Sequence, residues 1–251
     1  METTKKFDGR ASDYAHSRPQ YAAALLDHLY DNELLSPAST VADIGSGTGK
    51  FSRQLLDRQS EVYCVEPNAD MRSVAEATLC GYPRFHSIAG EATHTTLASG
   101  SVDCITSAQA FHWFAGEPFK QECLRILKPG GLAILIWNVR DLADERNRNW
   151  HDIFAHHCPT FRGFSNGIER DDAKIRAFFG GRYTRVAFDH PLLLDKVGFI
   201  KRSLSSSYSL RETDPDFPAY RAALEALYDR YENHGQITIA NRSVAYIGSV
   251  Q

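Results

Sequence analysis

The chain has 251 residues, of which 43% are hydrophobic and 24% are charged, and its formal net charge at pH 7 is −3. This composition is typical of one globular α/β domain with a substantial core, and its near-neutral charge excludes a strongly basic surface for nucleic acid. The longest apolar run, residues 132–137, is too short to cross a membrane, and residues 1–6 are not followed by the apolar stretch of a signal peptide. We therefore expect a cytoplasmic protein, monomer or homodimer, that acts on a small molecule.

The cysteines are odd in number and widely spaced, with no C-x-x-C pair, which excludes a disulfide framework and a zinc site of the usual spacing. The run His156-His157-Cys158 holds three metal-ligating residue types. Adjacent residues of a helix point in different directions, however, and no carboxylate or further histidine follows at helical spacing. We predict no metal.

Residues 5–21 form a polar opening segment. Residues 22–34 are predicted to be a helix, because the apolar residues Leu25, Leu26, Leu29 and Tyr30 recur at helical spacing. We expect this helix to pack on a sheet.

Residues 41–51 are predicted to form a buried strand, a glycine turn and the start of a helix. Gly45, Gly47 and Gly49 alternate, and glycines let a ligand approach the main chain without meeting a Cβ atom. A dinucleotide fingerprint would need glycine where the chain has Lys50, and a P-loop would need serine or threonine where it has Phe51. The turn therefore predicts a different ligand at the carboxyl edge of a parallel sheet.

Two acidic residues accompany this turn. Asp43 lies two residues before the first glycine, where a carboxylate suits a cationic ligand. Residues 61–66 read as the next strand and end in Glu66, roughly 20 residues further on, the interval at which βαβ units bind ribose hydroxyls. A helix is expected over residues 69–79, with Met71 pointing inward.

The following segments continue an alternation of strands and helices. Residues 85–89 are predicted to be the third strand, ending before Glu91 and Ala92, and residues 101–107 the fourth. The fourth strand is followed by the aromatic run of residues 108–114, then a helix over 117–127 and a fifth strand over 132–138, whose unbroken apolar run is typical of the middle of a parallel sheet.

The remaining third of the chain is less regular. Residues 139–182 are predicted to be a helical cap over the substrate, and residues 188–192 a sixth strand. Helices are expected over 194–204 and 215–232, and residues 236–240 and 243–247 are expected to form a terminal strand or hairpin. The expected organisation is one domain: N-terminal lid and helix (1–35), cofactor-binding core (36–138), cap (139–182) and C-terminal strands and helices that complete the sheet (183–251).

The glycine turn, its two acids and the aromatic run resemble those of class I S-adenosylmethionine-dependent methyltransferases. The resemblance implies a doubly wound, mostly parallel seven-stranded Rossmann-like sheet, S-adenosylmethionine as cofactor and methyl transfer to a small molecule. It implies that the turn and Asp43 hold the methionine half, Glu66 the ribose and Glu91 with Ala92 the adenine. The full set of implied cofactor residues is Arg18, Asp43, Gly45, Ser46, Gly47, Gly49, Glu66, Pro67, Met71, Glu91, Ala92, Ala108, Gln109, Phe111 and Trp113.

One departure concerns the adenine side. Relatives usually have an acidic residue and a proline after this acid-plus-small pair, whereas this chain has Thr93-His94-Thr95-Thr96. The loop is therefore expected to have a different shape.

The opening pattern from Phe7 to Tyr21 resembles the methyltransferase type-11 family, a branch that includes trans-aconitate methyltransferase. In that branch this segment folds over the cofactor, which implies a lid with Arg18 near the cofactor carboxylate and Tyr14 facing the methyl group. Simple packing of Tyr14 and pairing of Arg18 with a surface acid remain the alternative.

The implied catalytic residues are His112 and Tyr14. His112 could take a proton from a hydroxyl or amine acceptor. A carboxylate acceptor needs no base, and cations such as Arg18 or Arg140 would then matter more. Two other functions stay open: a non-catalytic S-adenosylmethionine-binding protein, and a nicotinamide-dependent oxidoreductase, against which Lys50 argues.

Overall fold

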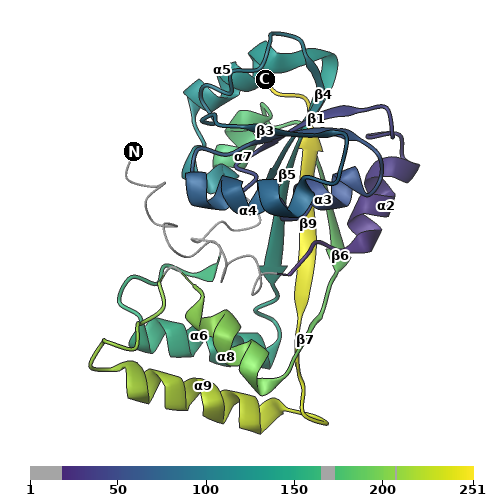
Figure 1. The fold of residues 1–251 in the computed structure, drawn as a ribbon. Helices are drawn as coiled ribbons and strands as arrows, with labels where there is room; N and C mark the ends of the chain where they lie inside the picture. Colours follow the sequence, from purple (N-terminus) through teal and green to yellow (C-terminus); the bar gives the residue numbers. More distant parts are fainter. Residues whose placement is uncertain (1–18, 165–172, 207) are drawn as a thin grey trace.

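The computed structural model describes residues 19–164, 173–206 and 208–251. Its main feature is a seven-stranded sheet whose strands fan out in Figure 1. The five strands from β3 to β5 are parallel, and β9 runs antiparallel to both of its neighbours. In spatial order the strands are β3 (Phe85–Ile88), β2 (Glu61–Val65), β1 (Thr40–Ile44), β4 (Val102–Ala108), β5 (Leu127–Arg140), β9 (Asn241–Gly248) and β6 (Thr184–Asp189).

Helices cover both faces of this sheet. One face packs on α2 (Ala23–Asp31), α3 (Lys50–Leu56) and α4 (Ala69–Leu79), with Leu25, Leu55 and Leu79 in the buried cluster. The other face packs on α5 (Glu117–Ile126) and α7 (Ala173–Phe178) and on the short 3-10 helix η2 (Phe111–Trp113). The central strands are buried on both faces, which is why they are mainly apolar, with buried polar residues such as Asp43 and Thr106 as exceptions. The predicted doubly wound α/β fold is confirmed.

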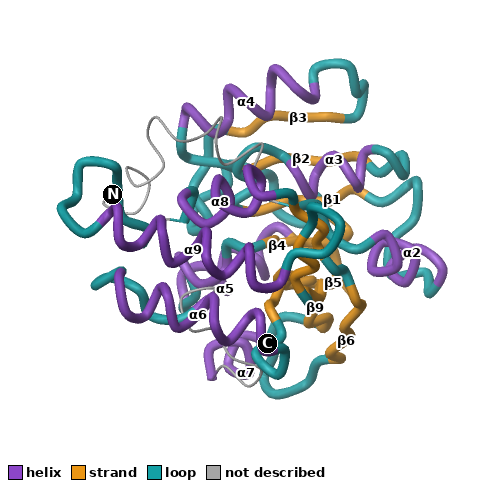
Figure 2. Tube along the Cα trace, turned by 90° about the horizontal axis from the view of Figure 1, so that it is seen from below, coloured by secondary structure: helices purple, strands orange, loops and turns teal. Residues whose placement is uncertain are grey.

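A second, smaller core lies beyond the carboxyl ends of the parallel strands. We call its described residues from 141–164 and 190–240 the cap. It contains α6 (Glu145–His157), α8 (Lys196–Leu204) and α9 (Phe217–Tyr231), which lie side by side in Figures 1 and 2, and a two-stranded sheet of β7 (Leu192–Leu194) and β8 (Ile237–Ile239). Trp150, Phe154 and Phe199 are buried at its centre.

The cap differs from the predicted one in its boundaries. Within the predicted range 139–182, α7 packs on the sheet rather than in the cap, because Ile175 and Phe178 are apolar and bury against the face that holds Phe119. The other half of the cap comes from α8, α9 and the small sheet, which follow β6 and precede β9 in the sequence. Helix α6 has one apolar stripe and covers it with α9, a partner distant in sequence.

The C-terminal strands also differ from the expectation. The predicted strand 188–192 spans the end of β6 and the start of β7. The two segments expected as a strand or hairpin do not pair with each other: β8 pairs with β7, and β9 pairs with β5 and β6. Strand β9 is the antiparallel strand within the mostly parallel seven-stranded sheet that the resemblance implied. Over the described ranges, no helix is both long and apolar enough to span a bilayer.

Helix α7 provides a test of this packing. Ile175 has no exposed surface, whereas Ala177 on the same helix is exposed. Ile175→Ala should lower the free energy of unfolding by about 2–5 kcal/mol, because it leaves a cavity against the sheet. The matched change Ala177→Ser should alter it by less than about 0.5 kcal/mol. Urea unfolding of both variants measures this, and equal effects would contradict the placement of α7.

Candidate functional site

The glycine turn, residues 45–49, follows the carboxyl end of β1. Its three glycines have φ values of +69°, +57° and +75°, a left-handed backbone that other residues adopt only with strain. The amides of Gly45 and Ser46 donate to the carbonyl of Val65 at 2.9 and 3.2 Å, and the amide of Gly49 donates to the carbonyl of Ser46 at 2.9 Å. The turn is therefore bound to the end of the neighbouring strand β2.

The three glycines have different surroundings. A Cβ on Gly45 would lie 2.6 Å from the Cβ of Ala110, and one on Gly49 would lie 2.6 Å from Leu79, whereas a Cβ on Gly47 would have no atom within 4 Å. Gly45 and Gly49 thus allow close packing of the fold. Gly47 instead leaves open space beside a bare main chain, and we call this space, with the turn around it, the cradle.

Glu66 closes one side of this cradle. It ends strand β2 and is nearly buried. Its Oε2 accepts from the amide of Gly47 and its Oε1 from the amide of Asn68, both at 2.9 Å. Burial raises the pKa of Glu66, and these two hydrogen bonds oppose the rise. The carboxylate is therefore fixed in direction by main-chain donors, with its remaining lone pairs able to accept further hydrogen bonds.

Asp43 lies beneath the turn rather than at its open side. Its two carboxylate oxygens accept from the hydroxyls of Ser52 at 2.6 Å and Thr106 at 2.9 Å. The residue is only 1% exposed, and this burial raises its pKa to about 6 despite the two hydrogen bonds. Asp43 therefore braces β1 against α3 and β4.

The adenine side contains the predicted residues Glu91 and Ala92. Glu91 is exposed, and its amide and carbonyl pair with His94 at 3.2 and 3.0 Å, which closes a short turn. Thr95 is fully buried, and both its amide and its hydroxyl donate to Glu122 on α5, at 2.7 and 2.6 Å. The threonine-rich departure from the family pattern thus ties this loop to the helix layer.

Pro67 and Met71 follow Glu66 in the sequence and precede this loop. Pro67 is exposed, and Met71 is buried in the first turn of α4. The side chain of Asn68 accepts from the amide of Met71 at 2.9 Å and caps that helix.

The predicted Ala108 ends β4, and the loop after it carries the predicted Gln109, Phe111, His112 and Trp113. Phe111 is buried at 1% exposure, which makes it a core residue of the sheet's α5 face. Gln109 holds a left-handed φ of +57°, rare for a residue other than glycine. Ala108, Gln109, His112 and Trp113 are partly exposed and remain candidates for contact with a ligand.

His112 is mostly enclosed, and its ring packs on Trp113 with 4.8 Å between ring centroids. Burial lowers its pKa to about 4, and the positive charge of Lys174 contributes in the same direction. The imidazole is therefore uncharged at neutral pH. Tyr14 and Arg18, the remaining predicted site residues, lie outside the described residues.

Three contributors were missed by sequence reasoning. Ser52 and Thr106 hold Asp43, and Asn138 binds the segment that precedes α2. The available signal was a polar residue inside an otherwise apolar strand or on the buried face of a helix, since such a residue needs a partner.

No three His, Cys, Asp or Glu side chains in the described part of the chain gather as metal ligands would. Cys158, from the His-His-Cys run, is buried in the core of the cap.

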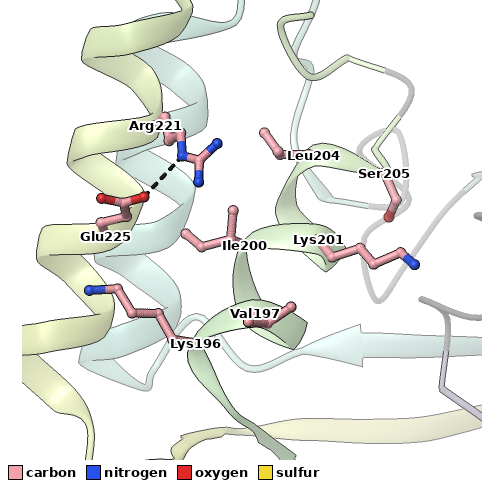
Figure 3. A pocket seen from close by; sticks show the side chains of 8 residues that line it. All are labelled: Lys196, Val197, Ile200, Lys201, Leu204, Ser205, Arg221 and Glu225. Atoms are coloured by element: carbon pink, nitrogen blue, oxygen red, sulfur yellow. Dashed lines mark hydrogen bonds and ion pairs between the residues drawn. The ribbon is translucent and has the colours of Figure 1, made fainter. Parts of the chain in front are cut away.

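A groove of about 480 Å³ lies on the cap between α8 and α9 (Figure 3). Lys196 and Arg221 at its rim bind Asp229 and Glu225, at 2.7 and 3.0 Å. No predicted site residue lines it.

Comparison with known proteins gives a match to a family described as a methyltransferase domain, over residues 42–135. An uncharacterized methyltransferase-like protein of Schizosaccharomyces pombe is 27% identical over 246 residues, covering 96% of this chain and 94% of that protein. An uncharacterized methyltransferase of Mycobacterium bovis is 36% identical over 135 residues, covering 54% of this chain and 53% of that protein. The chain thus spans almost all of the first relative and about half the length of the second.

Solved structures share the fold. A proposed type II methyltransferase from Anaeromyxobacter dehalogenans has a TM-score of 0.61 at 20% identity, covering 92% of this chain and 97% of that one. A proposed sarcosine dimethylglycine methyltransferase from Galdieria sulphuraria has a TM-score of 0.52 at 16% identity, covering 98% of each chain. Both likenesses confirm the Rossmann-like sheet.

The different surroundings of Gly45 and Gly47 predict different losses. Gly45→Ala should lower the free energy of unfolding by about 2–4 kcal/mol, because the methyl group adds a clash with Ala110 to backbone strain. Gly47→Ala should cost only about 1 kcal/mol of strain but weaken binding of S-adenosylhomocysteine about tenfold or more. Chemical unfolding and calorimetry measure the two effects; unchanged affinity in Gly47→Ala would contradict the cradle.

The raised pKa of Asp43 predicts a pH dependence of stability. Because its pKa is higher in the folded chain than in the unfolded chain, proton uptake favours the fold most below about pH 4, and this gain is lost as the pH rises through about 6. Asp43→Asn removes this titration. The unfolding free energy of the wild type minus that of the variant should therefore fall by about 2–3 kcal/mol between about pH 4 and pH 7. A difference that does not vary with pH would contradict the assignment.

Proposed function

We propose that this chain, an S-adenosylmethionine-dependent methyltransferase with a type-11 methyltransferase domain, transfers a methyl group to a small-molecule acceptor by in-line displacement. The observation that carries the proposal is the meeting of Glu66 and the open Gly47 main chain at the ends of adjacent parallel strands. Open α/β sheets bind their ligands at this edge. A cytoplasmic location and the absence of nucleic acid and membrane partners remain part of the proposal.

The residues at this edge fit the cofactor. Glu66 is oriented to accept hydrogen bonds from the ribose hydroxyls, and the main chain at Gly47 leaves room for the methionine half. The negative charge of Asp43 below the turn favours a cation above it. When bound, S-adenosylmethionine supplies a methyl group already activated on a positively charged sulfur, so the protein has mainly to align the acceptor and exclude water.

The cap supports an acceptor of small size. It lies beyond the carboxyl ends of the strands as a folded layer with its own apolar core around Trp150 and Phe154 (Figure 1). A cap of this kind leaves less room for a macromolecule than an open edge would.

Two residues could act on the acceptor, depending on its chemistry. His112 stays uncharged at neutral pH and can accept a hydrogen bond from a hydroxyl or amine, although its low pKa makes it a weak base. Arg140 ends β5 with its guanidinium over the rings of Trp150 and Phe164, at 4.4 and 4.2 Å from their centroids. This cation–π packing orients Arg140 at the junction of sheet and cap, where it could bind a carboxylate.

The first experiment tests the cofactor. S-adenosylhomocysteine at saturating concentration should raise the melting temperature by about 5–10 °C, and NAD should leave it unchanged. A rise with NAD alone would favour an oxidoreductase on the same sheet.

A second experiment tests the acceptor. The protein and methyl-labelled S-adenosylmethionine are incubated separately with a filtrate of small metabolites, with nucleic acid and with protein, and label is expected only in the first reaction. Label in nucleic acid or protein would contradict the proposal, and binding without any labelled product would favour the non-catalytic cofactor-binding alternative.

His112 gives a prediction for the reaction itself. Because its pKa is about 4, any rate that it contributes should not vary with pH between about 6 and 9. His112→Ala and His112→Asn should therefore lower kcat without changing the shape of the pH profile in that range. A wild-type limb near pH 6.5 that disappears in both variants would instead assign His112 an ordinary pKa and a role as general base.

A further inference from the structure

Asn138 connects segments that surround the candidate site, and the proposed function gives it no role in the reaction. It lies near the carboxyl end of β5, is 9% exposed, and is paired in register with Ser243 of the antiparallel strand β9. A polar pair at this depth must be satisfied by hydrogen bonds.

Only one assignment of donors and acceptors satisfies the hydrogen bonds around the Asn138 side chain. The amide of Ala22 can only donate, so the Ser243 hydroxyl accepts from it at 2.8 Å and gives its own proton to Oδ1 of Asn138 at 2.6 Å. The Nδ2 of Asn138 then donates to the carbonyl of Gln20 at 3.0 Å. The side-chain amide is thus fixed in orientation, and the segment before α2 is bound at two successive points.

The main chain of Asn138 reaches the other side of the site. Its carbonyl accepts from the side-chain amide of Gln109 at 3.0 Å, and the amide of Gln109 donates to the carbonyl of Ile136 at 2.8 Å. Gln109 begins the loop that carries His112 and Trp113. These two bonds to β5 hold Gln109 in its left-handed conformation, which an unsupported glutamine would leave.

We propose that the side chain of Asn138 is a positioning group: by binding Ser243 and the segment 20–22 it fixes the end of β5. The main-chain carbonyl of Asn138 at that fixed strand end then holds Gln109 in place for cofactor binding. The inference rests on the proposed function, because Gln109 matters only if the loop contacts the cofactor. Asn138 itself acts through Gln109 and need not touch the ligand.

The test measures cofactor affinity and thermal stability in two variants, each of which replaces one buried asparagine. Asn138→Ala keeps the carbonyl that accepts from Gln109 but releases the end of β5 from Ser243 and the segment 20–22. The variant should therefore weaken binding of S-adenosylhomocysteine, measured by calorimetry on the full chain, about tenfold. Asn147 has no exposed surface and donates to the carbonyls of Asp141 and Ala240 in the cap, so Asn147→Ala should lower the melting temperature to a similar extent but change affinity less than about twofold.

Ser243→Ala removes only a hydroxyl and keeps the test valid if Asn138→Ala fails to fold. It removes the bonds from Ala22 and to the Oδ1 of Asn138, so the Asn138 side chain loses one of its two anchors and binding should weaken by a smaller factor. If the wild type binds S-adenosylhomocysteine and both Asn138→Ala and Ser243→Ala bind it with the affinity of the wild type, the positioning role alone is overturned. A wild type that does not bind S-adenosylhomocysteine would overturn the proposed function, and this inference with it.

Discussion

The hydrogen bond from the amide of Gly47 to the carboxylate of Glu66 is the contact on which the candidate site depends. It joins the turn after β1 to the end of β2, alongside the bonds from Gly45 and Ser46 to Val65. Two loops that would otherwise move independently become one surface, with donors and a carboxylate already oriented. Because these loops are already ordered, little free energy is lost in ordering them when a ligand binds, and this favours affinity. The amides of Gly47 and Asn68 also offset part of the free-energy cost of burying the Glu66 carboxylate, since burial raises its pKa and these two bonds lower it.

The rest of the chain divides between holding this surface and covering it. The sheet and its two helix layers fix the strand ends, and Asp43 ties β1 to α3 and β4 from below. The cap is a separate apolar core around Trp150, joined to the sheet through the end of β5 and through β9. Under the proposed function, the sheet and its helix layers would bind the cofactor and the cap would select the acceptor, two tasks assigned to separate apolar cores.

The sequence predicted the parts that depend on local pattern. Helix α4 has the predicted bounds, and β1 to β4 lie at or within two residues of theirs, because apolar runs bounded by glycine or proline specify strands locally. Pairings between distant segments were not predictable in this way. The apolar stripe of α9 indicates burial but not its partner α6, and the strands near the C-terminus pair with different sheets. Within the site, the aromatic side chain of Phe111 could equally contact a ligand or pack in the core. Its contacts with residues distant in sequence, which the sequence pattern does not reveal, show that it packs in the core.

A crystal structure of the protein with S-adenosylhomocysteine would test the central claim most directly. We expect the ribose hydroxyls within hydrogen-bonding distance of the Glu66 carboxylate and the amino-acid portion beside the main chain of Gly47, with the Glu66–Gly47 bond intact. A nucleoside bound elsewhere, for example in the groove between α8 and α9, or a site in which Glu66 makes no contact with the ligand, would contradict the account.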